Sequence, residues 1–225
     1  MTEHEAKPSG GGAATIDLDQ YAAGSSNYRK HTSGNPVQRA LIGRFHRSLL
    51  ERVDALAPES FLDAGCGEGF VSSLLLARRP GLRLTGIEWS PQAAEIAAGR
   101  NPTGRFVVGD VTALPFKNDA FDVVGCFEVL EHLRGDGPER ALAEYARVAR
   151  RAVVLSVPHE PLFSLANAAR GKNLDVRPRG SDPDHVNFWS RQAFGAQVGR
   201  HFDVVWLGGS FPWTLCVARV RGTTA

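Results

Sequence analysis

The stretch FLDAGCGEGF, residues 61–70, holds three alternating glycines, Gly65, Gly67 and Gly69, shortly after Asp63. Residues without a Cβ atom can adopt positive φ angles and let a ligand lie against the main chain. If a helix begins directly after the loop, its first amide groups also face that ligand. The pattern therefore predicts a ligand-binding loop, although the same glycines could serve a tight turn between a strand and a helix.

Two further acidic residues, Glu88 and Asp110, end the next two apolar runs along the chain. The carboxyl ends of parallel strands meet at one edge of a sheet, and ligands of open α/β folds bind there. A carboxylate at the tip of the second strand can accept hydrogen bonds from both hydroxyls of a ribose. Together with the glycine loop, these strand tips predict a site for a nucleotide-like ligand.

The stretch FEVLEHL, residues 127–133, carries two carboxylates and an imidazole close together. If this stretch is helical, Glu128, Glu131 and His132 stand at positions i, i+3 and i+4 and share one face. One interpretation is a helical turn whose acids form local hydrogen bonds. Another is that His132 acts as a general base, since an imidazole titrates near neutral pH.

Short apolar runs alternate with helical stretches from residue 60 onwards. This alternation predicts an α/β fold with a mostly parallel sheet and helices on both of its faces. The predicted strands cover residues 60–64, 82–88, 105–110, 121–128, 152–158, 203–208 and 213–221. The predicted helices between them cover residues 70–79, 90–99, 138–151 and 190–202.

Residues 35–57 form the first predicted helix, because Asn35 can cap it and Pro36 suits its first turn. Apolar residues recur every four positions on one face, at Val37, Leu41, Phe45, Leu49 and Val53. Ahead of this helix, residues 1–19 show no hydrophobic periodicity and are expected to be a disordered tail. A single domain would then span residues 20–225, and Tyr28 and His31 could close over its site.

Residues 159–187, between the fifth strand and the following helix, are irregular. We expect them to form a lid at the carboxyl edge of the sheet. His185 is either a base on the substrate side or a buried histidine that fastens this insertion to the sheet, and His159 is a second candidate of the same kind. The insertion is basic, which would favour an anionic substrate if the cations contact it; they are Arg170, Lys172, Arg177 and Arg179.

The chain has 225 residues, of which 43% are hydrophobic and 22% charged, with a formal net charge of +2. This composition is typical of a soluble one-domain protein, and the charge gives no reason to expect a nucleic-acid partner. Cys66, Cys126 and Cys216 lie far apart with no CxxC pair, which favours a reducing, cytoplasmic compartment. The N-terminal stretch lacks the apolar core of a signal peptide, and no run reaches the roughly 20 apolar residues of a membrane span. We therefore expect no membrane partner, and the oligomeric state stays open.

The spacing GxGxG differs from the GxGxxG of nicotinamide-binding enzymes. With this spacing, the sequence resembles the class I S-adenosylmethionine-dependent methyltransferases, especially the group that contains the ubiquinone and menaquinone biosynthesis enzymes. The resemblance is carried by LDAGCGEG, GIEWS, VVGDVTALPF and FDVVGCFEVLEHL, in the order and spacing of that family. It implies a Rossmann-like sheet of seven strands with the last strand antiparallel, and S-adenosylmethionine as the cofactor.

The resemblance also implies which residues bind each part of the cofactor. The methionyl part would lie along the glycine loop, the ribose at the second strand tip, the adenine between the second and third tips, and the sulfonium beside the fourth. The methionyl part is thereby assigned to Asp63, Gly65, Cys66, Gly67 and Gly69, and the ribose to Glu88. The adenine is assigned to Trp89, Asp110 and Val111, and the sulfonium to Phe127 and Glu128.

A third interpretation of FEVLEHL is a metal site. The sequence has a distant similarity to methyltransferases that act on the 3′-terminal ribose of small RNAs and hold a divalent ion with Glu-x-x-Glu-His and a later histidine. The matching positions are Glu128, Glu131, His132 and His185. Mixed carboxylate and imidazole ligands suit Mn, Fe, Co, Ni or Zn. A metal-free site is nevertheless the favoured prediction.

The reaction that the resemblance implies is displacement of S-adenosylhomocysteine by an acceptor that attacks the sulfonium methyl. We expect a small-molecule acceptor that reacts through a hydroxyl oxygen, with nitrogen or carbon as further options. His132, His185 and Glu131 are the candidate catalytic residues. The alternatives are methylation of a nucleic-acid ribose or of a sugar or lipid-linked intermediate, a cofactor-binding protein without turnover, and a nicotinamide oxidoreductase.

Overall fold

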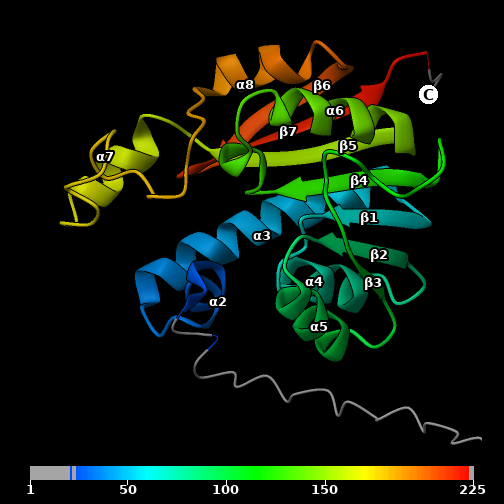
Figure 1. The fold of residues 1–225 in the computed structure, drawn as a ribbon, viewed down its shortest axis with the longest axis horizontal. Helices are drawn as coiled ribbons and strands as arrows, with labels where there is room; N and C mark the ends of the chain where they lie inside the picture. The colour runs from blue at the N-terminus through cyan, green and yellow to red at the C-terminus, as the bar shows by residue number, and fades with distance from the viewer. Residues whose placement is uncertain (1–20, 22–23, 223–225) are drawn as a thin grey trace, which may run out of the picture.

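Seven strands form one sheet in the order β3-β2-β1-β4-β5-β7-β6 (Figure 1). The computed structural model describes residue 21 and residues 24–222, so the tail predicted for residues 1–19 lies outside the described residues. Neighbouring strands are parallel except that β7 runs antiparallel to β5 and β6, which confirms the predicted fold. The strands are β1 (Ser60–Ala64), β2 (Arg83–Glu88), β3 (Arg105–Val108), β4 (Phe121–Phe127), β5 (Ala149–Pro158), β6 (Phe202–Ser210) and β7 (Trp213–Val220).

Helices cover both faces of the sheet, as the alternation of elements predicted. α3 and α4 pack against one face, α6 and α8 pack against the other, and α5 contacts β2 and β3. Figure 1 shows α2 and α7 at the same end of the molecule, beyond the ends of the strands. The helices are α2 (Ser26–Thr32), α3 (Pro36–Leu56), α4 (Phe70–Arg78), α5 (Pro91–Arg100), the 3-10 turn η1 (Leu130–His132), α6 (Gly137–Val148), α7 (Leu162–Ala168) and α8 (Arg191–Val198).

The central strands are buried on both sides. Every residue of β1 and β4 is buried. Neighbouring residues alternate between two cores, so that Phe61 packs on the side of α3 and Leu62 on the side of α6. This is the pattern of parallel strands between two helical layers. The ends of β1 and β2 are in register at one edge, where Ala64 pairs with Ile87.

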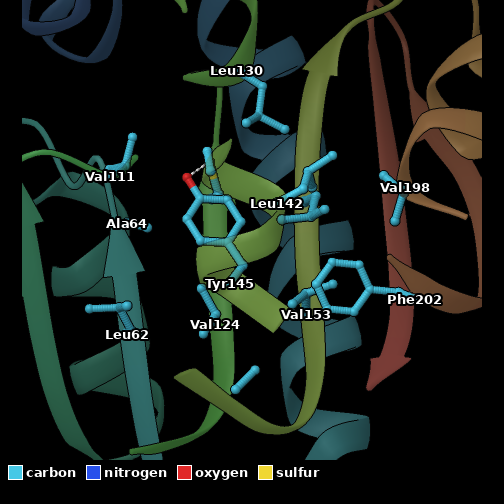
Figure 2. Close-up of a cluster of buried hydrophobic side chains, with 14 of the residues drawn as sticks. Leu62, Ala64, Val111, Val124, Leu130, Leu142, Tyr145, Val153, Val198 and Phe202 are labelled. Atoms are coloured by element: carbon cyan, nitrogen blue, oxygen red, sulfur yellow. Dashed lines mark hydrogen bonds between the residues drawn. The ribbon is translucent and has the colours of Figure 1, made fainter. Parts of the chain in front are cut away.

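The core on the α6 side holds β4 and β5 in place. Tyr145 of α6 is fully buried, and its hydroxyl donates a hydrogen bond of 3.2 Å to the Cys126 sulfur on β4 (Figure 2). Leu142 and Val153 pack into the same cluster. Burial of one large apolar side chain contributes about 1.5–3 kcal/mol. This buried core therefore fixes the positions of β4 and β5.

The first predicted helix is confirmed, with one error in its buried face. The Asn35 side chain accepts hydrogen bonds from the Val37 and Gln38 amides, as a cap does. Phe45, Leu49 and Val53 are buried. Val37, however, is 61% exposed, and its assignment to the buried stripe was wrong. The first turn of α3 extends past the strand ends, so it has no sheet beneath it (Figure 1).

Several other element boundaries differ from prediction. β3 ends at Val108 and not at Asp110, and α8 ends at Val198, so that Phe202 belongs to β6. Residues 149–151 belong to β5 and do not end the preceding helix, because Ala149 already pairs with Phe121 of β4. The lid, residues 159–187, is not wholly irregular, since it contains α7. Among the described residues, no helix has the length and apolar character of a membrane span.

Candidate active site

A cavity of about 870 Å³ opens at the carboxyl edge of the sheet. Its walls come from the glycine loop, the tips of β2 and β4, the turn η1, helix α2 and the lid. One space therefore joins the predicted cofactor residues to the predicted catalytic residues. The predicted cofactor residues that line it are Asp63, Gly65, Cys66, Gly67, Glu88, Trp89, Asp110, Val111, Phe127 and Glu128.

The glycine loop has the backbone shape that its composition suggested. Gly65, Gly67 and Gly69 have φ angles of 77°, 53° and 75°. A Cβ atom on Gly65 would lie 2.4 Å from a side-chain methyl of Val129, so a larger residue here requires Val129 or the loop to shift. Gly69 is placed differently from the other two, because it does not line the cavity and caps α4 beside Asn101.

Glu88 holds the glycine loop as well as facing the cavity. One of its carboxylate oxygens accepts a hydrogen bond of 3.0 Å from the Gly67 amide, and the other accepts one of 2.9 Å from the Ser90 amide. Each oxygen keeps a further lone pair for a ligand. Glu88 can therefore set the shape of the loop and bind a diol with the same carboxylate.

Asp63 is an acid buried beneath the loop. Its side chain is 1% exposed and accepts a hydrogen bond of 2.6 Å from the Ser72 hydroxyl. Burial raises the pKa of Asp63 to about 6, and the negative charge of Glu88 adds to the rise. A carboxylate in such a place is stabilised when a cation arrives.

The Asp110 side chain, which follows the third strand, is held by hydrogen bonds within its own turn. The Asp110 carboxylate accepts hydrogen bonds from the amide and the hydroxyl of Thr112, at 2.7 and 2.8 Å. Val111 is buried in the core cluster while still lining the cavity. Trp89 is 74% exposed at the cavity rim, so its indole is free to cover a ligand.

FEVLEHL does not form the α-helix on which the shared-face argument relied. Glu128 follows the end of β4 with a φ angle of 60°, and only residues 130–132 form a 3-10 turn. The expectation of i, i+3, i+4 helical spacing was therefore wrong. The sharp turn nevertheless brings Glu128, Glu131 and His132 to the cavity, because it starts at the strand tip.

Glu131 is the most unusual group in the cavity. Its side chain is 1% exposed, and among the described residues neither carboxylate oxygen has a hydrogen-bond partner. Burial raises the pKa of Glu131 well above its usual range, and the neighbouring Glu128 raises it further. A buried carboxyl group without a partner is unfavourable for folding, so such a group calls for a functional explanation.

Two histidines complete this cluster. One ligand atom from each of Glu131, His132 and His185 lies within 4.8 Å of the others, whereas Glu128 is outside this set. The His132 and His185 rings meet edge to face with centroids 4.9 Å apart. Burial lowers the pKa of His185 to about 4, so its ring is neutral at neutral pH.

The lid is fastened to this cluster by its backbone. The Val186 and Asn187 amides donate to the Glu131 carbonyl at 2.9 and 3.1 Å. The His185 ring itself contacts His132 and Phe163 of α7, and its Nδ1 has no hydrogen-bond partner within the described part of the chain. These contacts do not distinguish the two roles predicted for His185. His159 does not line the cavity.

Helix α2 covers the glycine loop, and sequence reasoning missed the residue that holds it. Glu68, in the middle of the loop, is 2% exposed. Its carboxylate accepts hydrogen bonds from Tyr21 at 2.8 Å, Ser25 at 2.6 Å and Asn27 at 2.5 Å. An acid between glycines was the available signal, but its partners lie more than forty residues away in the sequence.

His31 adds an aromatic contact to this attachment. Its ring stacks on Phe70, the first residue of α4, with centroids 4.5 Å apart. Asn27, Lys30 and His31 all line the cavity. His31 thus lines the cavity, whereas Tyr28, suggested together with it, packs on Phe70 and does not line the cavity. Helix α2 forms one wall of the cavity.

Replacing Glu68 by glutamine should loosen α2. The amide cannot accept three hydrogen bonds as a carboxylate does, so we expect S-adenosylhomocysteine affinity to fall about tenfold and residues 24–32 to be cut faster by protease. Glu95, exposed on α5, provides the matched control Glu95→Gln, which should change neither. Unchanged affinity in both variants, measured by calorimetry, would show that α2 is held in another way.

Comparison with known proteins agrees with this geometry. Residues 62–157 match the family described as "Methyltransferase domain". The demethylmenaquinone methyltransferase of Thermotoga maritima is 36% identical over 81 residues, which cover 36% of this chain and 35% of the relative. The malonyl-(acyl-carrier protein) O-methyltransferase of Serratia marcescens is 33% identical over 130 residues, which cover 57% of this chain and 47% of the relative. The chain thus spans about a third to a half of the length of these curated relatives.

A solved structure extends the likeness over most of the chain. Magnesium protoporphyrin IX methyltransferase from Synechocystis, with bound S-adenosylhomocysteine, superposes with a TM-score of 0.66 at 18% identity, covering 90% of this chain and 98% of that one. Sheet order, glycine loop and strand-tip acids have the arrangement of the class I methyltransferase fold. The part of the chain that matches the methyltransferase domain family is residues 62–157.

Proposed function

We propose that this protein transfers the methyl group of S-adenosylmethionine to a hydroxyl oxygen of a small molecule. The observation that carries the proposal is the single cavity that joins the glycine loop and strand-tip acids to the cluster of Glu131, His132 and His185. The same cavity thereby offers room for a cofactor and for an acceptor beside it. Nitrogen and carbon acceptors, and a nucleic-acid ribose or a sugar or lipid-linked intermediate, remain the alternatives to test.

The cofactor would lie with its amino group near Asp63 and the Gly65 carbonyl. A cationic amino group would lower the raised pKa of Asp63 and relieve the unfavourable burial of its charge. The ribose hydroxyls would bind Glu88, and the adenine would lie between Trp89 and the tip of β3. The sulfonium would then face Phe127 and Glu128, next to the catalytic cluster.

Methyl transfer needs little covalent chemistry from the protein. A lone pair of the acceptor oxygen attacks the methyl carbon in line with the carbon–sulfur bond, and S-adenosylhomocysteine leaves with the bonding electrons. The protein aligns the two reactants and removes water from the nucleophile. We assign removal of the hydroxyl proton to His132, which lines the cavity yet stays exposed, so that it can pass the proton to solvent.

The proposal also includes the extent of the domain and the cellular compartment. The one continuous sheet supports a single methyltransferase domain over residues 20–225, with residues 159–187 as its lid. The three cysteines are buried and free, which supports a reducing compartment.

The proposal is tested by incubating the protein with S-adenosylmethionine and a panel of hydroxyl, amine and carbon acceptors, with products identified by mass spectrometry. We expect an O-methylated product and S-adenosylhomocysteine in equal amounts, and a loss of turnover of about a hundredfold or more in His132→Ala. Calorimetry with NADH should show no binding. Tight S-adenosylhomocysteine binding without turnover of any acceptor would favour the non-catalytic alternative.

A second candidate for the same cluster is a divalent metal site. The donor set fits, because both Glu131 carboxylate oxygens lack a hydrogen-bond partner in the described part of the chain, and the three residues present ligand atoms within 4.8 Å of one another. Glu131, His132 and His185 would hold the ion, and a mixed carboxylate and imidazole set suits transition metals. A bound ion would supply a lowered pKa for the acceptor hydroxyl.

Chelation separates the two mechanisms. With His132 as the base, EDTA should leave turnover unchanged and elemental analysis of the purified protein should find no stoichiometric metal. The metal mechanism would be supported instead by two results. The purified protein would hold a stoichiometric ion that His185→Ala lacks, and EDTA would remove turnover that added metal restores.

A further inference from the structure

Lys30 places a positive charge inside the cavity from helix α2. It lines the cavity, and its ammonium lies 4.9 Å from the centroid of the Trp213 ring on β7. A cation over the face of an indole is held in place by the ring's electrons. Lys30 is half-buried, so its charge is screened less by solvent than that of a surface lysine.

Among the described residues, Lys30 forms no ion pair within 4.0 Å. Lys172, which lines the same cavity from the lid, forms none in that part of the chain either. Arg170 of the lid is different, because its guanidinium donates to the Ala166 carbonyl and the Asn167 side chain.

Lys30 also lies close enough to influence the catalytic cluster. Burial raises the pKa values of Glu128 and Glu131, and the positive charge of Lys30 opposes the rise at both. The ammonium is therefore within electrostatic reach of the place where the acceptor reacts. Helix α2 carries Lys30 and Trp213 of β7 contacts its ammonium, so two elements position this charge at the acceptor end of the cavity.

We propose that the methyl acceptor carries an oxyanion, a carboxylate or a phosphate, which binds Lys30, with Lys172 as a second cation from the lid. This inference rests on the proposed methyl transfer and narrows its substrate class. An oxyanion accepts strong, charge-assisted hydrogen bonds from an ammonium. An oxyanion bound to both lysines would also draw the lid toward α2, because Lys172 belongs to the lid and Lys30 to α2.

The alternative role for Lys30 is a counter-charge for Glu128 and Glu131. The two roles predict different results. A counter-charge affects every acceptor equally, whereas a binding residue distinguishes charged from neutral acceptors of the same shape. The test must therefore compare matched ligands and not simply measure a loss of activity.

The matched ligands are 4-hydroxybenzoate, 4-hydroxyphenyl phosphate and the neutral 4-hydroxybenzamide, titrated by calorimetry into protein saturated with S-adenosylhomocysteine. We expect at least one of the two anions to bind about tenfold or more tightly than the amide, and the anion preferred tells carboxylate from phosphate. Lys30→Met should remove this preference, Lys30→Arg should keep most of it, and Lys172→Met should reduce it. Lys117→Met, at an exposed site outside the cavity, is the control and should leave it unchanged.

The inference is overturned if the wild-type protein binds neither anion better than the amide, or if Lys30→Met keeps the wild-type preference. An equal weakening of all three ligands in Lys30→Met would assign Lys30 the counter-charge role. Failure of the proposed function has a different signature, because it would appear in the wild-type protein as absent S-adenosylhomocysteine binding or as absent methyl transfer to every acceptor.

Discussion

Replacing Glu131 by glutamine is expected to abolish methyl transfer and, at the same time, to make the protein more stable at alkaline pH. Both expected effects follow from its carboxyl group, which is buried in the catalytic cluster without a hydrogen-bond partner in the described residues. We expect the Glu131 carboxyl group to assist His132, which lies in the same cluster, in proton transfer. Groups that act in proton transfer contribute about a hundredfold to ten-thousandfold to the rate. We therefore expect kcat to fall by about a hundredfold or more, with S-adenosylhomocysteine affinity retained.

The effect on stability depends on pH in a defined direction. The pKa of Glu131 is raised in the folded protein, so the folded state binds this proton more tightly than the unfolded state does. Stability is therefore lost as the pH rises from the unfolded pKa, about 4.3, through the folded pKa. Glutamine has no proton to lose, so at pH 8 the variant should be more stable than the wild-type protein.

Denaturant unfolding at pH 5 and pH 8, with initial rates measured in parallel, checks both expectations. Glu144→Gln is the matched control, because Arg147 donates hydrogen bonds to the Glu144 carboxylate and lowers its pKa. That variant should lose stability at pH 8 and keep its catalytic rate. A Glu131→Gln protein that is less stable than wild type at pH 8, or as active, would contradict this account.

The second large effect is expected from Gly65→Ala in the glycine loop. Gly65 has a φ angle of 77°, and an added methyl group would lie 2.4 Å from Val129. Either Val129 or the loop must shift, and we expect the loop to move because alanine disfavours this φ angle, displacing the amide of Gly67 that Glu88 holds. We expect S-adenosylhomocysteine affinity to fall by about a hundredfold or more, measured by calorimetry.

The control for Gly65→Ala is Gly99→Ala in α5, where a Cβ atom would meet nothing within 4 Å. Since alanine favours helix more than glycine does, this variant should be slightly stabilised and should bind the ligand normally. Circular dichroism of both variants distinguishes a shifted loop from an unfolded protein. Full affinity in a folded Gly65→Ala protein would mean that the loop tolerates the displacement.

The glycine loop and the strand-tip acids could be predicted from the sequence because a parallel sheet brings its strand ends together. Asp63, Glu88 and Asp110 each end or nearly end an apolar run, so their meeting follows from the order of elements alone. Their individual contacts with a cofactor stay predictions.

The turn after β4 could not be predicted in the same way. Glu128 adopts a positive φ angle that its residue type disfavours, and only the packing around it makes that conformation acceptable. Lys30 and Glu68 were missed for a related reason. Their roles depend on where α2 docks, and that docking joins segments far apart in the chain that share no periodic pattern.

The attachment of α2 to Glu68 has a consequence for the order of kinetic events. The same helix covers the glycine loop and carries Lys30, so the cover of the cofactor and the anchor of the acceptor are one element. We expect S-adenosylhomocysteine to leave when α2 moves away, and that movement would remove Lys30 from the acceptor. We therefore expect an ordered sequential mechanism, in which S-adenosylmethionine binds first and S-adenosylhomocysteine departs last.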